Sequence, residues 1–542
     1  MADTGAINAA GEVSEKGIVK IIAASSVGTM VEWYDFYIFG SLAAVIASKF
    51  YQTGTPLGDM IAWLAAFAVG FIVRPFGAIV FGRVGDLIGR KYTFMVTMTL
   101  MGVCTFAVGL LPTIDKIGPV AGLILIGLRI LQGLALGGEY GGAATYVAEH
   151  SPDRKRGFYT SWIQITATAG LFMSLGVILA TRSILGEAAF NDYGWRVPFL
   201  LSAVLVLVSL YIRISLKESP LFAGVKKAGG LSKNPLKESF TNPVNLKWVL
   251  LALFGATMGQ GVVWYTGQFY ALFYLQKVFQ VTLIPSNVIV AGALLCATPM
   301  FVVFGKWSDT IGRKKIMLAG MVLAVVTWYP IYGLMAANAP ATYKATAADL
   351  KGVKEVVAAG KDPGVKKIVK DETQAAIEPA LTAVTAANVV EIPATELKEG
   401  DKVVVKFQPF LFPYSGYNPW VLGFCVFLQV LYVTMVYGPI AAFLVELFPT
   451  NIRYTSMSLP YHIGNGVFGG MVPIIGLSLL GATGNNYAGL WYPMGVAAVC
   501  AVVCFFLIPE TAQVDIHAGE SIAQHAAHGK GTPAVQAVPD EI

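Results

Sequence analysis

Five ionisable side chains interrupt long apolar stretches in the first part of the chain: Glu32, Asp35, Arg74, Arg129 and Glu139. A charge in an apolar environment is costly, so such residues usually face one another or a water-filled path. A carboxyl group that alternates between apolar surroundings and an arginine partner can bind and release a proton near neutral pH. Glu32 and Asp35 share a helix face because they are three residues apart. We expect Asp35, Glu32 and Arg129 to handle a proton; permanent ion pairs between helices are the alternative.

The two arginines are also candidates for binding an acidic molecule, because a guanidinium group can hold a carboxylate with two parallel hydrogen bonds. Arg74 could instead pair with Glu32 or Asp35, and Arg129 with Glu139. Both interpretations remain open at the level of the sequence.

Further polar side chains are predicted to line a binding site in the second part of the chain. Gln260, Trp264 and Gln268 are four residues apart and form one stripe along a helix, although helix packing is an alternative use for them. His462 could titrate, but a lone histidine in an apolar segment is more often hydrogen-bonded to a neighbour. The full set of expected substrate-binding residues is Arg74, Arg129, Tyr34, Gln132, Glu139, Gln260, Trp264, Tyr265 and Gln268.

The composition indicates the elements that carry these residues. Of 542 residues, 56% are hydrophobic and 13% are charged, against about 25% charged in soluble domains. This is typical of a polytopic membrane protein, and it excludes a disordered chain, a nucleic-acid binder and a disulfide scaffold. No nucleotide loop, metal cluster or nucleophile motif is present in the sequence, so we expect neither an enzyme nor a cofactor.

Twelve apolar runs are long enough to be transmembrane helices, which predicts an all-α membrane protein. They are 20–48, 59–82, 92–112, 119–148, 158–181, 196–216, 247–276, 286–305, 316–337, 420–447, 454–480 and 490–508. Loops rich in Lys and Arg follow the even-numbered spans 2, 4, 6 and 8. The positive-inside rule therefore predicts that these loops and both termini are cytoplasmic.

Two motifs occur twice. GRVGDLIGRK (82–91) matches GKWSDTIGRK (305–314), and the pattern Glu-x-x-Pro-x-x-x-Arg begins at Glu149 and again at Glu446. The two copies of the first motif are 223 residues apart, and the two copies of the second motif are 297 residues apart. The difference indicates that about 74 residues are inserted between the two motifs in the second half. The resemblance to a known family, described below, implies that residues of these motifs latch the cytoplasmic side: Asp86, Gly89, Arg90, Asp309, Gly312, Arg313, Glu149, Arg156, Glu446 and Arg453.

These observations predict two six-helix halves, 19–218 and 247–338 with 415–511, joined by a cytoplasmic loop at 219–246. Residues 1–18 are expected to form a cytoplasmic tail. The insert at 339–414 is predicted to lie outside, as a loop or a small cap between helices 9 and 10. The last segment, 512–542, lacks apolar periodicity and is predicted to be a disordered cytoplasmic tail.

The paired motifs resemble the signatures of the major facilitator superfamily, whose substrate site lies near the midplane between two six-helix halves. EWYDFYIFG (32–40), RPFG (74–77), WRVPFLLS (195–202) and LKESPLF (216–222) narrow the resemblance to the metabolite:proton symporter family. That family includes carriers for 2-oxoglutarate, shikimate, citrate and proline or betaine.

The resemblance implies alternating-access transport of a small molecule with a proton, by a monomer in a bacterial inner membrane, with the lipid bilayer as its other partner and no nucleic acid. Two arginines near the expected site favour a small organic acid similar to 2-oxoglutarate or shikimate. A zwitterion such as proline or betaine, an uncoupled uniporter and, less favoured, a membrane sensor are the alternatives.

Overall fold

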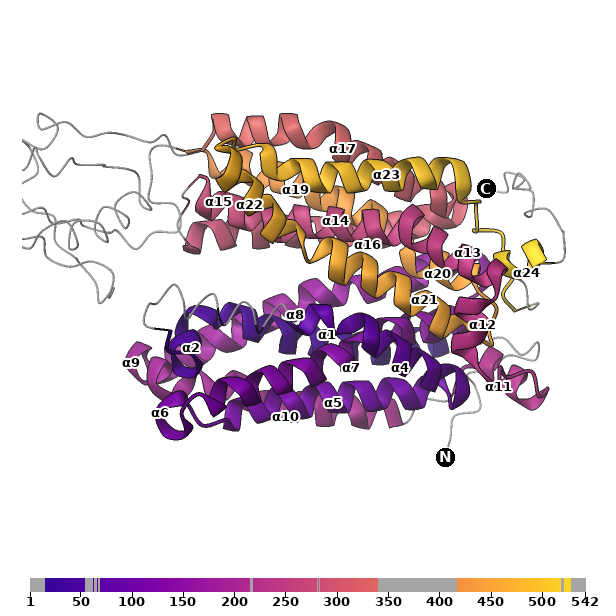
Figure 1. The fold of residues 1–542 in the computed structure, drawn as a ribbon, viewed down its shortest axis with the longest axis horizontal. Coiled ribbons are helices and arrows are strands. Elements are labelled where there is room, and N and C mark those ends of the chain that lie inside the picture. The colour runs from indigo at the N-terminus through magenta and orange to yellow at the C-terminus, as the bar shows by residue number, and fades with distance from the viewer. Residues whose placement is uncertain are drawn as a thin grey trace, which may run out of the picture.

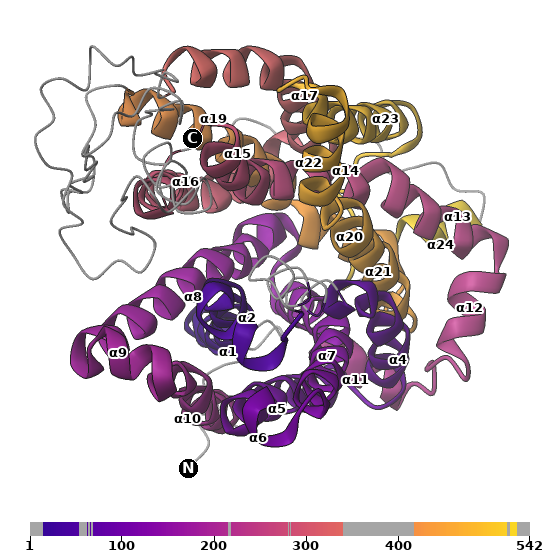
Figure 2. The same ribbon diagram turned by 60° about the vertical axis from the view of Figure 1, so that its left-hand side comes forward.

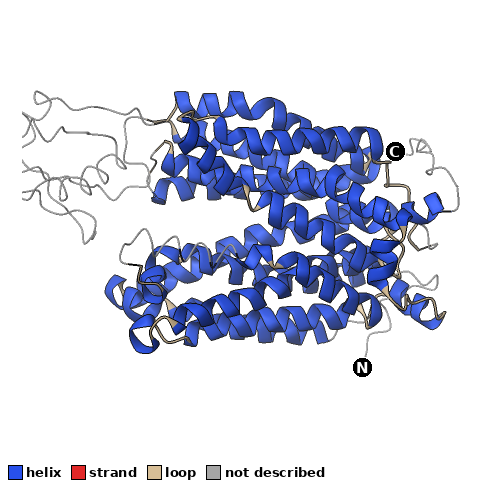
Figure 3. Cartoon of the chain, in the orientation of Figure 1, coloured by secondary structure: helices blue, strands red, loops and turns tan. Residues whose placement is uncertain are grey.

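The computed structural model describes residues 15–53, 62, 66, 69–214, 218–279, 281, 283–339, 417–517 and 521–527. Within these ranges every regular element is a helix and none is a strand, as Figure 3 shows. This agrees with the all-helical architecture expected for a membrane protein whose backbone polar groups must be satisfied internally.

The first half of the chain forms one group of helices, drawn in indigo and magenta in Figure 1. The helix α4 begins at Arg74, and Pro75 follows in its first turn, where the fixed φ of proline suits a helix start. The helices of this half are α1 (Glu15–Ser41), α2 (Ala43–Phe50), α4 (Arg74–Leu87), α5 (Arg90–Leu110), α6 (Ile114–Ile117), α7 (Val120–His150), α8 (Arg156–Leu185), α9 (Glu187–Ala189) and α10 (Arg196–Ile214).

The second half forms the other group, drawn from pink to yellow in Figure 1. Its long helices are interrupted by three π-helical turns, η4 (Leu253–Thr257), η5 (Thr266–Tyr270) and η8 (Ile463–Gly469). The helices are α13 (Pro243–Ala252), α14 (Met258–Tyr265), α15 (Ala271–Lys277), α16 (Leu283–Ile311), α17 (Arg313–Ala337), α19 (Pro419–Tyr437), α20 (Ile440–Leu447), α21 (Arg453–His462), α22 (Val472–Thr483) and α23 (Trp491–Leu507).

The two groups lie side by side in both Figure 1 and Figure 2, and α16 packs along α8 while α21 packs along α4. Between them the chain forms α11 (Pro220–Lys227) and α12 (Pro235–Thr241). These short helices lie at the end of the bundle where α1 begins and where α24 (Ile522–Ala527) is found (Figure 1). We call this the terminal end of the bundle.

Nine helical stretches of the described residues are long and apolar enough to cross a membrane. They are Arg90–Leu110, Val120–His150, Asp153–Leu185, Pro243–Gln276, Pro285–Ile311, Arg313–Ala337, Pro419–Leu447, Arg453–Leu480 and Ala488–Leu507. The helices α1 and α10 coincide with two more of the expected spans. Part of the remaining span, 59–82, lies outside the described residues, so the count of twelve stays a prediction.

The C-terminal segment differs from the prediction of disorder over 512–542. Residues 512–517 and 521–527 are described, and they return to the terminal end of the bundle, where Val514, Ile516 and Ile522 are buried. The helix α24 packs against α13 and α20. No apolar periodicity marks this segment in the sequence, because its few buried apolar side chains lie on irregular backbone and one short helix.

The insert expected at 339–414 lies almost entirely outside the described residues, but both of its flanks are described. The backbone N–H of Asn418 donates a hydrogen bond of 3.1 Å to the carbonyl oxygen of Asn338. The Asn418 side chain caps α19 by accepting hydrogen bonds from the N–H groups of Trp420 and Val421. The chain therefore leaves α17 and enters α19 at a single point.

Candidate functional site

A small cavity of about 50 Å³ lies between the two halves, with walls from α1, α4 and α7 on one side and α14, α19, α21 and η8 on the other. Four of its lining side chains can carry charge: Glu32, Arg74, Glu139 and His462. All four are at least nine-tenths buried. The other lining residues are Thr29, Trp33, Phe36, Leu136, Tyr140, Trp264, Tyr265, Tyr437, Tyr461 and Asn465.

Close packing of α4 on α7 positions the charged residues of the first half. A Cβ atom on Gly77 would collide with the backbone of Leu134, and one on Gly137 would collide with the carbonyl oxygen of Arg74. Small residues let two helix backbones approach in this way. As a result, Arg74 at the start of α4 faces the same cavity as Glu139 of α7.

Aromatic side chains from both halves supply half of the described residues that line the cavity. Trp33 of α1 meets Trp264 of α14 with ring centroids 5.7 Å apart. Tyr140 of α7 stacks on Tyr461 of α21 at 3.7 Å, and the hydroxyl groups of Tyr461 and Tyr437 are 2.6 Å apart. The electron-rich faces of such rings attract cations.

The Arg74 guanidinium is itself held by aromatic rings. It lies 4.3 Å from the ring centroid of Phe71 and 5.4 Å from that of Phe36, and it also contacts Tyr265. A cation that is held by ring faces keeps hydrogen-bond donors for another partner. This geometry suits an arginine that binds a carboxylate entering the cavity.

A second polar cluster lies in the first half and does not line the cavity. Arg129 donates a hydrogen bond of 2.6 Å to Gln132, which donates one of 2.8 Å to Thr105. Asp35 lies beside Thr105 and within electrostatic reach of Arg129. The cluster is buried, with Arg129 3% exposed and Asp35 1% exposed. The structure thus brings Asp35 and Arg129 together as the sequence predicted.

Glu32 and Asp35 connect the two sites, because they lie one turn apart on α1. Glu32 lines the cavity, while Asp35 belongs to the Arg129 cluster. The arginines are divided in the same way, since Arg74 faces the cavity and Arg129 does not. The interpretation that both arginines lie at one binding site is therefore not supported.

Three other predicted binding residues are not among those that line the cavity. Tyr34 lies in the core and donates a hydrogen bond of 2.7 Å to the carbonyl oxygen of Pro198. Gln260 exchanges two hydrogen bonds, of 3.1 and 2.7 Å, with the cavity residue Asn465. Gln268 falls within the π-helical turn η5, so the four-residue spacing that predicted one stripe no longer keeps it on the face of Trp264.

At the terminal end, residues of the repeated motifs join the two halves. Asp86 at the end of α4 accepts hydrogen bonds of 3.3 and 2.8 Å from the N–H groups of Tyr454 and Thr455, where α21 begins. Glu149 of α7 accepts one of 2.7 Å from Arg453. A helix N-terminus favours a negative partner.

The second copies of the motifs make the same contacts in the opposite direction. Asp309 of α16 accepts hydrogen bonds of 2.8 Å from the N–H groups of both Gly157 and Phe158, where α8 begins. Glu446 accepts one of 2.7 Å from Arg156. Each half therefore caps a helix of the other half and forms a buried ion pair with it.

The arginines that follow the two turns complete this inter-half network. Arg90 pairs with Asp86 at 3.1 Å and donates a hydrogen bond of 2.6 Å to the carbonyl oxygen of Thr450. Arg313 pairs with Asp309 at 2.6 Å and with Glu446 at 3.1 Å. All ten residues predicted to latch this side of the molecule are thus found within one region.

Two acidic residues of this region were missed by the sequence analysis. Glu218 accepts a hydrogen bond from the N–H of Lys91, and Glu510 accepts one of 2.7 Å from the N–H of Arg313. Gly89 and Gly312, which lie just before α5 and α17, have φ of 148° and 114°. A Cβ atom on Gly89 would collide with the carboxylate of Glu218, and one on Gly312 with that of Glu510. This explains why both turns need glycine.

The hydroxyl residues that follow these acids also join the network. Ser219 donates a hydrogen bond to Glu149, and Thr511 donates one of 2.6 Å to Glu446. The sequence signal was present, since Glu-Ser follows the sixth expected span and Glu-Thr follows the twelfth. A match of two residues is too short to be recognised as a repeated motif from the sequence alone.

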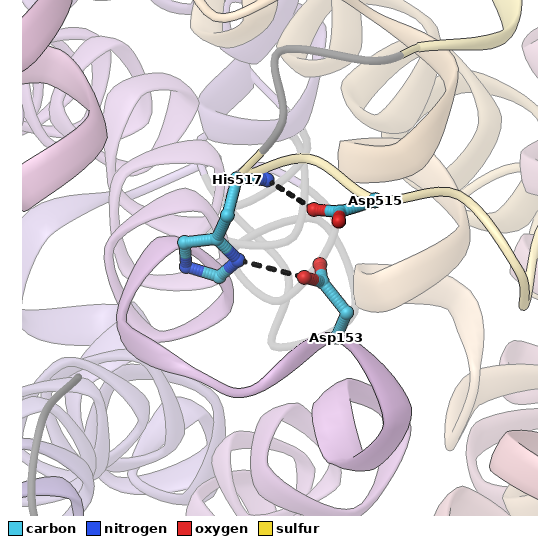
Figure 4. Close-up of side chains that lie close together, drawn as sticks. All are labelled: Asp153, Asp515 and His517. Carbon is cyan, nitrogen blue, oxygen red and sulfur yellow. Dashed lines mark hydrogen bonds and ion pairs between the residues drawn. The ribbon is translucent and has the colours of Figure 1, made fainter. Parts of the chain in front are cut away.

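One group of side chains at the terminal end has the residue types of a metal site: Asp153, Asp515 and His517 (Figure 4). Asp153 forms an ion pair with Arg156, and its other oxygen lies 3.0 Å from Nδ1 of His517. Asp515 accepts a hydrogen bond of 2.9 Å from the N–H of His517. Burial and the positive charge of Arg156 lower the pKa of His517. These contacts fasten the C-terminal segment to the turn before α8.

Comparison with known proteins connects this geometry to a family. A family model described as "Sugar (and other) transporter" matches residues 20–241. The inner membrane metabolite transport protein YhjE of Escherichia coli K12 is 31% identical over 506 residues, which cover 91% of this chain and 94% of YhjE. The chain belongs to the metabolite:proton symporter family of the major facilitator superfamily. This family membership makes it a multi-pass membrane transporter and not an enzyme.

Other members of the superfamily are similar over different lengths. The proline/betaine transporter of Escherichia coli K12 is 36% identical over 326 residues, so the chain matches 65% of that protein's length and 59% of its own. Among solved structures, the proton:xylose symporter XylE superposes with a TM-score of 0.62 over 94% of this chain and 98% of XylE, at 15% identity. The XylE likeness establishes the major facilitator fold.

Proposed function

We propose that this transporter carries a small zwitterion of the proline or betaine kind together with a proton, by alternating access. The observation that carries the proposal is the lining of the cavity between the halves. One guanidinium, from Arg74, and two carboxyl groups, from Glu32 and Glu139, share it with seven aromatic rings. A molecule with one carboxylate and one ammonium group complements both signs of charge.

The same charges weigh against the organic acid that the sequence favoured. That expectation rested on two arginines at the binding site, but Arg129 belongs to the separate cluster with Gln132. A dicarboxylate such as 2-oxoglutarate would bring two negative charges to Glu32 and Glu139, and Arg74 is the one arginine or lysine among the described residues that line the cavity. The relatives named as proline/betaine transporters agree with the zwitterion.

The aromatic wall supports a cationic group on the cargo. The ring centroids of Trp33 and Trp264, which come from opposite halves, are 5.7 Å apart, and tyrosines from both halves line the same cavity. Quaternary ammonium groups bind to such rings with about 0.5–2 kcal/mol per contact. The carboxylate of the same molecule would reach Arg74.

We place proton binding at Asp35, beside Arg129. A carboxyl group one turn from Glu32 can respond to cargo, because a cation bound at Glu32 changes the field at Asp35. Loss of its pairing with Arg129 would favour the protonated form. This links cargo binding to proton uptake through one helix.

The inter-half network is the proposed gate. Its buried ion pairs hold the terminal end shut, and rocking of the halves would break them as the cavity opens on that side. We place this end and both termini in the cytoplasm, in accord with the loop charges, and the protein in a bacterial inner membrane as a monomer.

Uptake into proteoliposomes tests the proposal. Betaine, proline, 2-oxoglutarate, shikimate and citrate would be supplied with and without an inward proton gradient. Accumulation of betaine or proline only with the gradient is the expected result. Accumulation of an acid alone would restore the organic-acid interpretation, equilibration that ignores the gradient would indicate a uniporter, and binding without flux would indicate a sensor.

A further inference from the structure

His462 is a buried cavity residue that the proposed mechanism has not yet used. It ends α21, is 3% exposed and lines the cavity. Neither ring nitrogen has a hydrogen-bond partner within the part of the chain that the structure describes. The expectation that this histidine is bonded to a neighbour is therefore wrong. A buried polar atom without a partner is destabilising, so one that lines a cavity calls for a partner that enters the cavity.

The residues around His462 are already satisfied by one another. Tyr461 is bonded to Tyr437 through their hydroxyl groups, and Asn465 exchanges two hydrogen bonds with Gln260. The π-helical turn η8 starts directly after His462 and fixes the direction of the helix there. These neighbours therefore bond to one another, and the imidazole meets the Tyr461 ring edge-on, with centroids 5.1 Å apart.

Its position relative to Arg74 indicates what it binds. Arg74 comes from α4 in the first half and His462 from α21 in the second, and both face the same cavity. An imidazole carries at least one N–H donor in either protonation state, and an ionised carboxylate offers only acceptors. Carboxyl side chains also line the cavity, but they come from α1 and α7 of the first half.

We infer that His462 donates a hydrogen bond to the carboxylate of the transported molecule, which Arg74 holds from the other half. The inference rests on the proposed function in one respect, that the cavity is the cargo site. The inference goes beyond the proposed function by making His462 a specificity-determining residue. His462 would favour a cargo that carries a carboxylate over an otherwise similar cation that lacks one. It also makes the carboxylate a bridge between the halves.

Ligand binding to the purified full-length protein tests this inference. Trp33 and Trp264 line the cavity, so their fluorescence reports occupancy. The probes are glycine betaine against tetramethylammonium, and proline against pyrrolidine, with 2-oxoglutarate and shikimate included. The variants are His462→Phe, which keeps a planar ring without nitrogens, and His462→Gln, which keeps a donor. His525→Phe on α24, outside the cavity, is the matched control.

Loss of a hydrogen bond to a charged group weakens binding by about ten- to hundredfold. We expect His462→Phe to weaken betaine and proline by that factor and to change tetramethylammonium and pyrrolidine by less than about twofold. His462→Gln should restore most of the affinity, and His525→Phe should have no effect. The melting temperature of ligand-free His462→Phe should not fall, because no bond is lost.

Other outcomes overturn the inference. An equal loss for carboxylated and uncarboxylated probes would make His462 a shape-filling residue, and no loss would remove it from the site. If His462→Phe does not fold, His462→Leu replaces it, and a folding defect in both would indicate a structural role. If 2-oxoglutarate or shikimate binds and neither betaine nor proline does, the proposed zwitterion cargo is refuted but the role of His462 is not. The acid that binds then serves as the probe for the His462 variants. No binding of any carboxylate would refute both.

Discussion

At the scale of single residues, the two buried arginines of the first half have different partners although the sequence makes them look equivalent. Arg74 rests on aromatic rings and faces the cavity, whereas Arg129 bonds to Gln132 and lies within reach of Asp35. On this separation we base our proposal that Arg74 binds cargo and that Arg129 takes part in proton handling. It leads to one prediction for each.

We predict that Asp35→Asn abolishes proton-driven accumulation. The amide cannot release a proton, so the steady-state level inside proteoliposomes should fall at least about tenfold, to simple equilibration, while cargo exchange without a gradient persists. Uptake and counterflow assays measure the two activities. The exposed Asp115→Asn is the matched control and should behave as the unchanged protein. Full accumulation by Asp35→Asn would contradict this role.

We predict that Arg74→Lys raises the KM for cargo by about tenfold or more, because an ammonium group keeps the charge but cannot make two parallel hydrogen bonds to a carboxylate. Initial uptake rates over a range of cargo concentrations give the value. Arg182→Lys at the end of α8 tests the same exchange outside the cavity. An unchanged KM in Arg74→Lys would mean that Arg74 serves only the packing of Phe36 and Phe71.

At the scale of elements, the fit of α4 against α7 decides where the cavity charges lie. We predict that Gly137→Ala lowers both the melting temperature and the transport rate, since its added methyl group collides with the backbone at Arg74. Overpacking of this kind costs about 1–3 kcal/mol. Thermal unfolding in detergent and uptake rates test this.

Gly127 provides a control on the same helix. A Cβ there meets no atom within 4 Å, so Gly127→Ala should be neutral or slightly stabilising, as expected for alanine in a helix. Equal destabilisation by the two changes would show that general helix propensity, and not the α4–α7 contact, accounts for the effect of Gly137→Ala.

The helices also show which structural features can be predicted from the sequence. The apolar runs predicted the positions of the long helices, because a membrane span must be long and apolar. The contacts of the repeated Asp and Arg residues were expected from the family resemblance of their motifs. Gln268 was misplaced because a π-helical turn changes the period without a sequence signal. The missing partners of His462 could not be predicted, because they depend on residues from other helices.

At the scale of the whole molecule, the two halves are held together at the terminal end by reciprocal contacts. Glu149 reaches Arg453 while Glu446 reaches Arg156, and all four side chains are almost completely buried. Removing one partner of a buried ion pair is strongly unfavourable for the state that contains the pair, by about 3–5 kcal/mol. Alternating access, as proposed above, requires the protein to leave this state as well, so we expect the network to set the balance between two conformations.

We predict that Glu149→Gln, and separately Glu446→Gln, shifts that balance toward opening at the terminal end. A cysteine at the buried Ser161, between α8 and α16, would report the opening through its rate of alkylation in a Cys296→Ser background. The rate should rise at least about tenfold, given the energy of such pairs. The control Asp192→Asn lies at the opposite end and should leave the rate unchanged. An unchanged rate in both glutamate variants would exclude a gating role for the network.

The hydrogen bond between Asn338 and Asn418 has a consequence for how this protein can change over evolutionary time. Because the chain leaves and re-enters the bundle at one point, the length of what lies between has little influence on the helices. Closing a longer loop costs only about 0.6 kcal/mol for each doubling of its length. A lineage can therefore gain, lose or exchange this stretch without repacking the bundle. The same junction is a natural place for an engineer to graft a fluorescent reporter.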